Sequence, residues 1–209
     1  MSDGLSLPCV ILCGGASSRF GAPKAFAMLG GAPLVVHVRD RLAQQTNGPI
    51  AINVAGEGFD AESIKGVSHV ADHPVIPDLL PPGTGPLAGL HCAMTWAKEQ
   101  GASGVMTSPT DIPFLPLDFA ARLAAVNGPA IAVSPSGLHP LCGYWPVQLL
   151  PMLEEKIADG LSAARHWARA IGVAEVLFSP TGKIDPFFNI NRREDLSRAE
   201  MLIAARKPD

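Results

Sequence analysis

The amino-acid sequence predicts an α/β fold with a mostly parallel central sheet, and three observations support this prediction. Short apolar runs alternate with segments whose apolar residues recur at helical spacing. The helical segments are long enough to cross over between parallel strands in the usual right-handed sense. The chain has 209 residues, 47% of them hydrophobic, which suffices for a sizeable core. In such sheets ligands bind outside the carboxyl ends of the strands, so functional residues are expected there.

Seven apolar runs are the predicted strands, and turn residues bound each of them. In chain order they read CVILC, PIAINVAG, VSHVAD, GVMTSPTD, PAIAVSPS, HPLCGYWP and VAEVLFS. The segments between them supply the predicted helices PLVVHVRDRLAQQ, GPLAGLHCAMTWAKEQG and PLDFAARLAAVNG. Residues 147–171 are predicted to form one interrupted helix or two short ones, and RREDLSRAEMLIAARK a surface helix. After about Gly137 the alternation is less regular, which favours a mixed-sheet extension of a single domain over residues 1–209.

The composition excludes several classes of partner. Acidic residues (19) exceed basic residues (16), and the formal net charge of -3 provides no global positive field for nucleic acid or an anionic membrane. The four cysteines are scattered, which indicates reduced thiols in the cytoplasm and no structural zinc or disulfide framework. The start of the chain lacks a basic leader, and no segment approaches the ~20 apolar residues that span a bilayer. An anionic ligand must therefore be held by local cations.

A glycine-rich stretch, LCGGASSRFGAPK, follows the first predicted strand and predicts an anion site. Gly14 and Gly15 allow close approach of the backbone to a ligand, and Arg19 and Lys24 add full positive charges. A P-loop is excluded because the lysine comes two residues too late, and the GxGxxG pattern of dinucleotide-binding folds is absent. A plain connection between strand and helix, with solvated cations, is the structural alternative.

Polar side chains follow three of the predicted strands. Asp111, flanked by prolines in TSPTDIPFLP, comes just beyond a strand and is chemically sufficient as a Mg²⁺ ligand beside phosphate oxygens. Asn53 in AIN and Asp72 in VAD occupy equivalent places after two other strands. Because parallel strands end at one edge, we expect these side chains to meet there. Each of them could instead stabilise a turn or cap a helix.

The motifs resemble, in order, the signature segments of molybdenum cofactor guanylyltransferases within the nucleotidyltransferase superfamily. The glycine-rich stretch resembles the LAGGxSxRMGxxK signature, and the match continues through AFAMLGGAPLVVHV, TGPLAGL, SPTDIPFLP, HPLCGYW and FFNINRREDL. Cys13, Phe20 and Thr110 stand where the family commonly has Ala, Met and Cys. The resemblance implies a Rossmann-like three-layer nucleotidyltransferase fold with a mixed C-terminal extension. It makes residues 1–136 the nucleotide-binding part and residues 137–209 the acceptor side.

The resemblance also implies roles for individual residues. Catalysis is expected from Lys24, Arg19 and Asp111, with Asp111 binding Mg²⁺. The residues expected to bind GTP are Leu12, Cys13, Gly14, Gly15, Lys24, Asn53, Asp72 and Asp111. The acceptor is expected near His139, Asn189 and Asn191, the two amides sharing one face if FFNINR is extended. His139 could instead be a hydrogen-bonded structural residue, the two amides could belong to an edge strand, and Cys13 could be a nucleophile.

The activity that the resemblance implies is transfer of GMP from GTP to the terminal phosphate of molybdopterin, with or without bound molybdenum. The products are molybdopterin guanine dinucleotide and pyrophosphate. Proteins that deliver or receive the molybdenum cofactor are further candidate partners. The alternatives are a molybdopterin cytidylyltransferase, a sugar-phosphate nucleotidyltransferase of the same fold, and a nucleotide-binding adaptor without turnover. The Gly14–Gly15 pair and the FFNIN segment favour the guanylyl family.

Overall fold

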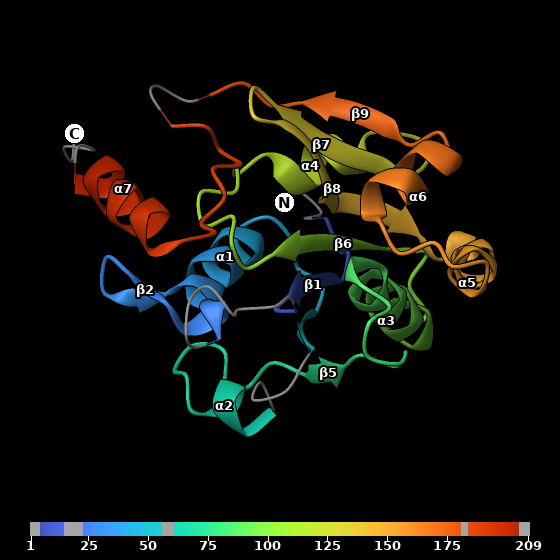
Figure 1. The fold of residues 1–209 in the computed structure, drawn as a ribbon, viewed down its shortest axis with the longest axis horizontal. Helices are drawn as coiled ribbons and strands as arrows, with labels where there is room; N and C mark the ends of the chain where they lie inside the picture. The colour runs from blue at the N-terminus through green and yellow to red at the C-terminus, as the bar shows by residue number, and fades with distance from the viewer. Residues whose placement is uncertain (1–4, 15–22, 56–60, 181–183, 205–209) are drawn as a thin grey trace.

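Seven strands form one central sheet in the computed structural model, which describes residues 5–14, 23–55, 61–180 and 184–204 (Figure 1). These strands are β1 (Cys9–Leu12), β4 (Ile50–Val54), β5 (Val75–Pro77), β6 (Gly104–Pro109), β7 (Ala130–Ser134), β8 (Gly137–Pro146) and β9 (Ala174–Leu177). Their order is β5-β4-β1-β6-β8-β7-β9. All pairings are parallel except those of β8 with β6 and β7. The predicted mostly parallel sheet with a mixed C-terminal extension is therefore confirmed.

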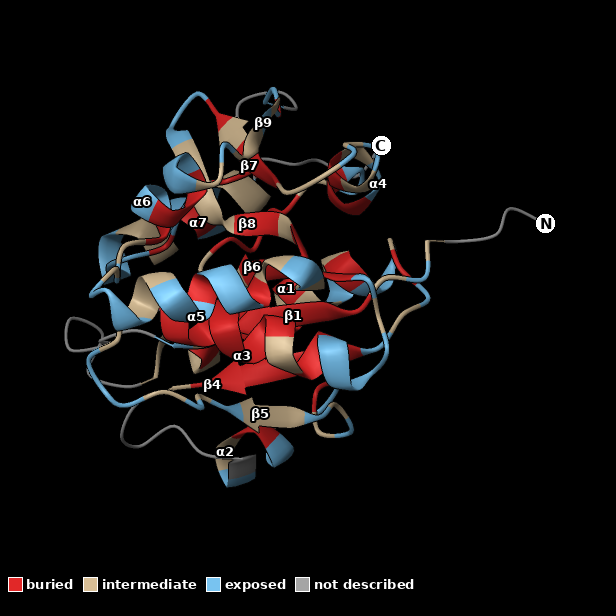
Figure 2. Ribbon diagram, turned by 90° about the vertical axis from the view of Figure 1, so that its right-hand side faces the viewer, coloured by how far each residue is buried: buried red, intermediate tan, exposed pale blue. Residues whose placement is uncertain are grey.

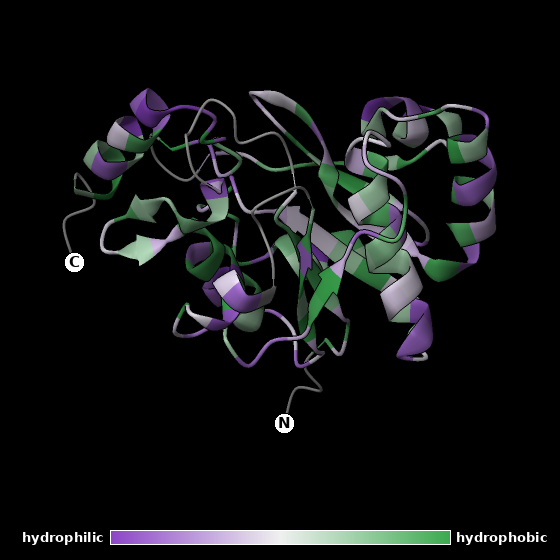
Figure 3. Ribbon diagram, turned by 60° about the horizontal axis from the view of Figure 1, so that its bottom comes forward, coloured by the Kyte–Doolittle hydropathy of each residue, from purple (hydrophilic) through white to green (hydrophobic). Residues whose placement is uncertain are grey.

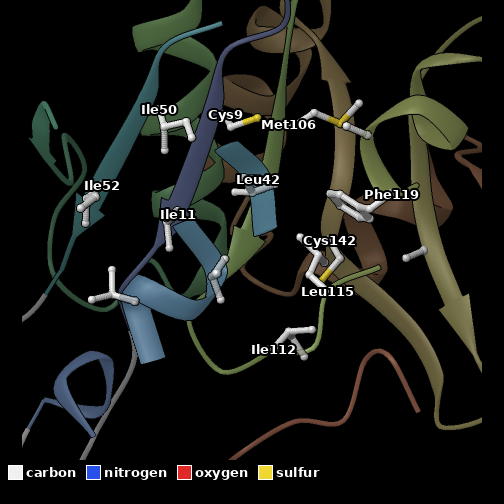
Figure 4. Close-up of a cluster of buried hydrophobic side chains, with 14 of the residues drawn as sticks. Cys9, Ile11, Leu42, Ile50, Ile52, Met106, Ile112, Leu115, Phe119 and Cys142 are labelled. Carbon is white, nitrogen blue, oxygen red and sulfur yellow. The ribbon is translucent and has the colours of Figure 1, made fainter. Parts of the chain in front are cut away.

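Helices cover both faces of the sheet, because alternate residues of the buried strands point to opposite sides. In β1, Cys9 and Ile11 join the core under the helices α1 and α4, and Leu12 joins the core under α3, α5 and α6. Figure 2 shows that the central strands are buried and that α3 and α5 lie in front of them, and Figure 4 shows the core around Ile11 and Phe119. The helices span Leu34–Ala43 (α1), Ala61–Lys65 (α2), Pro86–Glu99 (α3), Phe119–Ala124 (α4), Leu150–Ala158 (α5), Ala164–Ala170 (α6) and Arg193–Ala204 (α7).

A third, smaller core lies beside the main sheet. Here α7 packs near a two-stranded hairpin of β2 (Met28–Leu29) and β3 (Ala32–Pro33), and Figure 1 places the two side by side. Leu29, Phe114, Ile190 and Ala199 are buried in this core. Figure 3 shows that hydrophobic residues gather in the central strands, while α7 presents a mixture of polar and apolar residues. This core fixes the segment before α7 against the main sheet.

The VSHVAD segment is not a strand, contrary to the prediction. Residues 67–72 form turns and a bend, and His69 has a positive φ of 73°, a backbone conformation that interrupts an extended run. Val70 is nevertheless fully buried, which explains the apolar alternation that suggested a strand. The strand that pairs with β4 is β5, which begins three residues after Asp72.

Other elements depart from the sequence pattern in smaller ways. Residues 147–171 contain the short 3-10 helix η3 (Val147–Leu149) followed by α5 and α6, so the prediction of two short helices is confirmed. The β2–β3 hairpin, which turns at Gly30 and Gly31, and α2 were not predicted. Residues 189–191 are irregular, so the edge-strand interpretation of FFNINR is wrong. None of the helices in the described ranges is long and apolar enough to pass through a bilayer.

Candidate active site

The carboxyl ends of β1, β4, β5 and β6 meet at one edge of the sheet because these strands are parallel. In the strand register Leu12 pairs with Asn53 on one side and with Pro109 on the other. The N–H of Thr110 donates to the carbonyl oxygen of Leu12 at 3.2 Å, which holds the turn before Asp111 against β1. The fold therefore brings the residues after three strands to the edge at which a ligand was expected.

The charged centre of this edge joins three distant parts of the chain. Lys24 lies in the short 3-10 helix η2 (Lys24–Phe26), and its Nζ is 2.9 Å from Oδ2 of Asp111. The same Nζ donates to Oδ1 of Asn191 at 3.1 Å. The side chains of Lys24 and Asp111 are only 20% and 18% exposed, so solvent screens the pair less than it would on an open surface. The predicted cation, the predicted metal ligand and one of the two predicted amides thus lie together.

The Asp111 carboxylate has one oxygen engaged and one oxygen open. Oδ2 accepts the bond from Lys24, whereas Oδ1 is buried and has no hydrogen-bond donor within the described residues. A buried carboxylate oxygen without a donor is costly unless a cation takes that place. Mg²⁺ binds through one or two carboxylates and completes its coordination with water and phosphate oxygens. The donor chemistry of this site therefore fits a magnesium ion.

A second polar group lies at the ends of β4 and β5. Nδ2 of Asn53 donates to Oδ1 of Asp78 at 2.9 Å and to the carbonyl oxygen of Ile76 at 3.2 Å. Oδ1 of Asn53 is buried and has no partner among the described residues. A Cβ added at Gly89 would lie 2.9 Å from this oxygen, so only glycine leaves the amide its place. The ends of these strands thus hold a buried, unpaired acceptor beside an acidic side chain.

Asp78 is a candidate site residue that sequence reasoning missed, and Asp72 lies elsewhere. Asp72 is exposed and precedes β5, so the structure does not bring it to the carboxyl edge. Asp78 directly follows β5, and its N–H donates to the carbonyl oxygen of Val54. Burial raises the pKa of Asp78, while the hydrogen bond from Asn53 and the nearby His91 act in the opposite direction. The signal that could have located it is the acid just after the VIP run.

The remaining residues of the glycine-rich stretch are described only in part. The N–H of Cys13 donates to the carbonyl oxygen of Asn53, and a Cβ on Gly14 would lie 2.8 Å from Cβ of Ala55. Gly15 and Arg19 lie outside the described residues. Desolvation, with a smaller contribution from the charge of Asp111, raises the pKa of the Cys13 thiol well above its usual value. A thiol that is protonated near neutral pH does not suit the role of nucleophile.

The predicted acceptor residues lie on the β7–β8 side of the same edge. Oγ of Ser134, the last residue of β7, lies 2.8 Å from Nε2 of His139 and donates to Oδ2 of Asp185 at 3.0 Å. The ring of His139 stacks on Phe187 with 4.6 Å between centroids. Asn189 is exposed, whereas Asn191 reaches Lys24. His139 is therefore hydrogen-bonded within the protein, as the structural alternative for this residue predicted.

Fold and edge chemistry together define an α/β protein of the nucleotide-binding class, with a cation paired to a carboxylate at the carboxyl ends of parallel strands. Residues 9–175 match the family model of the MobA-like NTP transferase domain. The chain belongs to this family, as the ordered motifs predicted.

Relatives of known name agree with this assignment. The chain is 37% identical over 219 residues to a molybdenum cofactor guanylyltransferase of Rhizobium rhizogenes, with 98% of this chain and 96% of the relative covered. It is 44% identical over 204 residues to the protein of the same name from Rhizobium meliloti, covering 92% and 90%. The shared segments therefore include both sides of the edge.

Solved structures show the same fold. The molybdopterin-guanine dinucleotide biosynthesis protein A of Archaeoglobus fulgidus superposes with a TM-score of 0.70 at 22% identity, covering 95% of this chain and all of that one. A 2-C-methyl-D-erythritol 4-phosphate cytidylyltransferase of Thermus thermophilus gives a TM-score of 0.64 at 17% identity, covering 93% and 98%. At these identities the likeness concerns the fold alone, and it confirms the nucleotidyltransferase architecture.

Proposed function

We propose that this protein transfers GMP from GTP to the terminal phosphate of molybdopterin, forming molybdopterin guanine dinucleotide and pyrophosphate. The observation that carries the proposal is the contact of Lys24 with Asp111 at 2.9 Å, with Oδ1 of Asp111 left open. A fixed cation beside an unpaired carboxylate oxygen is suited to binding a nucleoside triphosphate together with its metal ion. The guanylyltransferase names of relatives that align over nearly the whole chain support the choice of nucleotide and acceptor.

In this proposal the nucleotide half of the edge positions and neutralises the triphosphate. Lys24 offsets the negative charge that grows on the phosphate oxygens as the bond to pyrophosphate breaks. Asp111 and Asn191 orient the ammonium group of Lys24 through their contacts with Nζ at 2.9 and 3.1 Å. Arg19, in the glycine-rich stretch, is proposed to add a second positive charge. Such a site works by orientation and fixed charge, and it needs no covalent enzyme intermediate.

Asp111 would hold the magnesium ion through its open Oδ1. A magnesium ion bound there supplies charge neutralisation at phosphate oxygens. The carboxylate stays oriented because the N–H of Ile190 donates to the backbone oxygen of Asp111 at 2.9 Å. Lys24 occupies the other carboxylate oxygen, so Oδ1 is the oxygen left for the cation.

The guanine base is proposed to lie near the ends of β1, β4 and β5. Guanine offers N1–H and an exocyclic amine as donors, and the open Oδ1 of Asn53 and the carboxylate of Asp78 are acceptors. The backbone around Leu12, Cys13 and Gly14 would complete the contacts. Adenine has no N1–H donor, so it would leave an acceptor unpaired at a cost of about 1–3 kcal/mol. Asp72, which lies before β5, stays a predicted GTP-binding residue.

The acceptor phosphate would approach from the β7–β8 side, where His139, Asn189 and Asn191 lie. Asn191 touches Lys24, so an acceptor bound on this side would meet the triphosphate at the shared lysine. Proteins that deliver or receive the molybdenum cofactor are further proposed partners. The cytoplasmic location expected from the sequence stays a prediction.

The direct test is a panel of GTP, ATP and CTP at equal concentration with Mg²⁺ and molybdopterin, followed by analysis of the pterin dinucleotide and pyrophosphate. We expect the guanine dinucleotide to exceed the adenine and cytosine products by more than about tenfold. This ratio is the discrimination that one unpaired buried polar group supplies. A mainly cytosine product would make the protein a cytidylyltransferase. Absence of pterin product with every nucleotide would refute the proposed acceptor.

A further inference from the structure

A closed hydrogen-bond cluster on the acceptor side of the edge contains two residues to which no role has yet been given, Ser134 and Asp185. Oδ1 of Asp185 accepts the N–H of Phe187 at 2.8 Å, and Oδ2 accepts the hydroxyl of Ser134 at 3.0 Å and the N–H of Ser136 at 3.2 Å. Ser134 is only 4% exposed, and it ends β7 at the edge shared with Asp111. The centre of the cluster is therefore buried and lies at the candidate site.

The directions of these bonds follow from the charge of Asp185. Burial alone would raise the pKa of Asp185, but the hydrogen bonds from Phe187, Ser136 and Ser134 outweigh it and hold that pKa below its usual value. An ionised carboxylate can only accept hydrogen bonds. Since a bond to a carboxylate is stronger than one to a neutral ring, the single proton of the Ser134 hydroxyl goes to Asp185.

The tautomer of His139 is then fixed. With its proton committed, Oγ of Ser134 can only accept at its two 2.8 Å contacts, which are with the hydroxyl of Ser136 and with Nε2 of His139. The Ser136 hydroxyl donates to this nearer oxygen and not to Nε2, which is 3.4 Å away, so Nε2 must carry a hydrogen. Desolvation lowers the pKa of His139, and the charges of Asp185 and Asp111 only partly offset this effect. In the neutral ring that results, Nδ1 has no proton. Nδ1 makes no hydrogen bond within the described part of the chain and is not one of its buried unpaired atoms.

We propose that Ser134 and Asp185 are positioning residues that hold His139 as the Nε2-protonated tautomer, so that its bare Nδ1 accepts a hydrogen bond from an N–H group of the pterin acceptor. The lone pair on Nδ1 repels phosphate oxygens, so this nitrogen selects the heterocycle of the acceptor and not its phosphate. A pterin ring carries ring N–H groups and an exocyclic amine that can donate to it. The proposal rests on the acceptor named in the proposed function.

The same carboxylate also places the other acceptor residues. Phe187, whose N–H binds Oδ1 of Asp185, is fully buried, and its ring supports His139 by stacking. Three residues further on, Ile190 is buried and its N–H binds the backbone of Asp111. Asp185 thus ties the β7–β8 hairpin to the segment that leads to Asn191. Replacing Ser134 with alanine removes the hydroxyl that contacts the imidazole but keeps Asp185 and its bonds from the N–H groups of Phe187 and Ser136, which makes Ser134 the sharper position to test.

The first measurement is the tautomer itself. Long-range ¹H–¹⁵N correlation spectra of the full-length protein distinguish the two imidazole nitrogens, and a His139→Gln variant identifies the His139 signals. We expect wild-type His139 to be protonated at Nε2 and unprotonated at Nδ1, and Ser134→Ala to give a mixture of tautomers. A wild-type ring protonated at Nδ1 overturns the proposal, even if the variant does not fold.

The second measurement separates positioning from general stability. Ser134→Ala should lower kcat/KM for the pterin acceptor by about tenfold, mainly through KM, with KM for GTP unchanged, since about one hydrogen bond is lost. The matched control is Ser103→Ala, which removes an exposed hydroxyl just before β6, at the end of that strand away from the site; it should stay near wild type. An unchanged acceptor KM in a folded Ser134→Ala variant contradicts the proposal. If the wild type forms no pterin product, the proposed function fails, while the spectrum still reports whether Ser134 sets the tautomer.

Discussion

The two halves of the carboxyl edge use their polar groups in opposite ways. On the nucleotide half, Asp111 and Asn53 each leave one buried oxygen without a donor among the described residues. On the acceptor half, both oxygens of Asp185 and the hydroxyl of Ser134 have partners within the protein. The first half leaves two buried acceptors unpaired, whereas the carboxylate and the hydroxyl of the second half are paired within the protein.

This difference indicates what each half contributes. Buried acceptors without a donor are unfavourable in the free protein, so a ligand that pairs with them removes this cost. Substitutions of these residues should therefore have the largest effects on the binding of nucleotide and metal. A satisfied cluster orients one group and stabilises its own segment, so its loss should be milder. Lys24 joins the halves, since it contacts Asp111 on one side and Asn191 on the other.

The largest effect is expected from Asp111→Asn. The amide cannot replace the charge of the open oxygen, so transfer should fall by at least about a hundredfold, as for removal of one preorganised electrostatic group. Product formation and thermal unfolding are measured on the same samples. The matched control is Asp118→Asn, at an exposed carboxylate beside α4. Unchanged turnover would remove Asp111 from the metal role, and gross unfolding would assign it a structural role.

Lys24→Ala should be nearly as severe, because it removes the charge that both halves share. We expect a loss of about 2–4 kcal/mol in transition-state stabilisation, together with weaker GTP binding. Lys98→Ala is the control, since Lys98 is exposed in the last turn of α3, at the far end of that helix. If affinity and rate both match wild type, the glycine-rich stretch is only a connection.

Asn53→Ala should chiefly alter base choice. It removes the open Oδ1 and the donor to Asp78, so GTP should lose about 1–3 kcal/mol of its advantage over ATP in competition. The exposed Asn47, just before β4 at its opposite end, provides the control variant Asn47→Ala. An unaltered ratio of guanine to adenine product would place the base elsewhere.

Cys13→Ala should leave turnover nearly intact, because its thiol is protonated near neutral pH and its N–H, which contacts Asn53, is kept. Burst kinetics and the steady-state rate provide the check. A loss as large as that of Lys24→Ala would revive the nucleophile interpretation.

The smallest effect concerns stability against pH on the acceptor half. The folded pKa of Asp185 is depressed, so its stabilisation is present above the unfolded carboxyl value of about 3.9 and is lost as pH falls through the lower folded value. The difference in Tm between wild type and Asp185→Asn should therefore be constant from about pH 7 to pH 5 and shrink below about pH 4. A difference that does not depend on pH would contradict the ionised network.

Much of the nucleotide half could be predicted from sequence, because its signals are local. The stretch ending at Lys24 and the proline-flanked Asp111 are recognisable from neighbouring residues, and the structure joins them. Asp78 was missed because the buried turn around Val70 has the apolar alternation of a strand. The pattern therefore predicts the strand too early in the chain and makes Asp72 the acid that follows it. The true strand β5 has only three residues and ends in a proline, so its pattern is weak.

The acceptor half was less predictable for a different reason. Ser134 and Asp185 are 51 positions apart, and no periodicity or turn signal connects them. Asn189 and Asn191 were found by motif, but the irregular backbone there follows from burial of Ile190 in the core beside α7, which depends on the whole fold. Local patterns locate residues with strong intrinsic chemistry, and tertiary packing decides which of them meet.

The central claim is that Oδ1 of Asp111 holds a metal ion together with the nucleotide phosphates. Mn²⁺, which prefers the same oxygen ligands as Mg²⁺, is a paramagnetic probe for this site. Electron paramagnetic resonance of free Mn²⁺ is recorded while wild type or Asp111→Asn is titrated in the presence of GTP, with Asp118→Asn as control. We predict that wild type and Asp118→Asn bind one Mn²⁺ with GTP and that Asp111→Asn binds it at least about tenfold more weakly, as loss of one charged ligand implies. Equal Mn²⁺ affinity in Asp111→Asn and wild type would contradict the account.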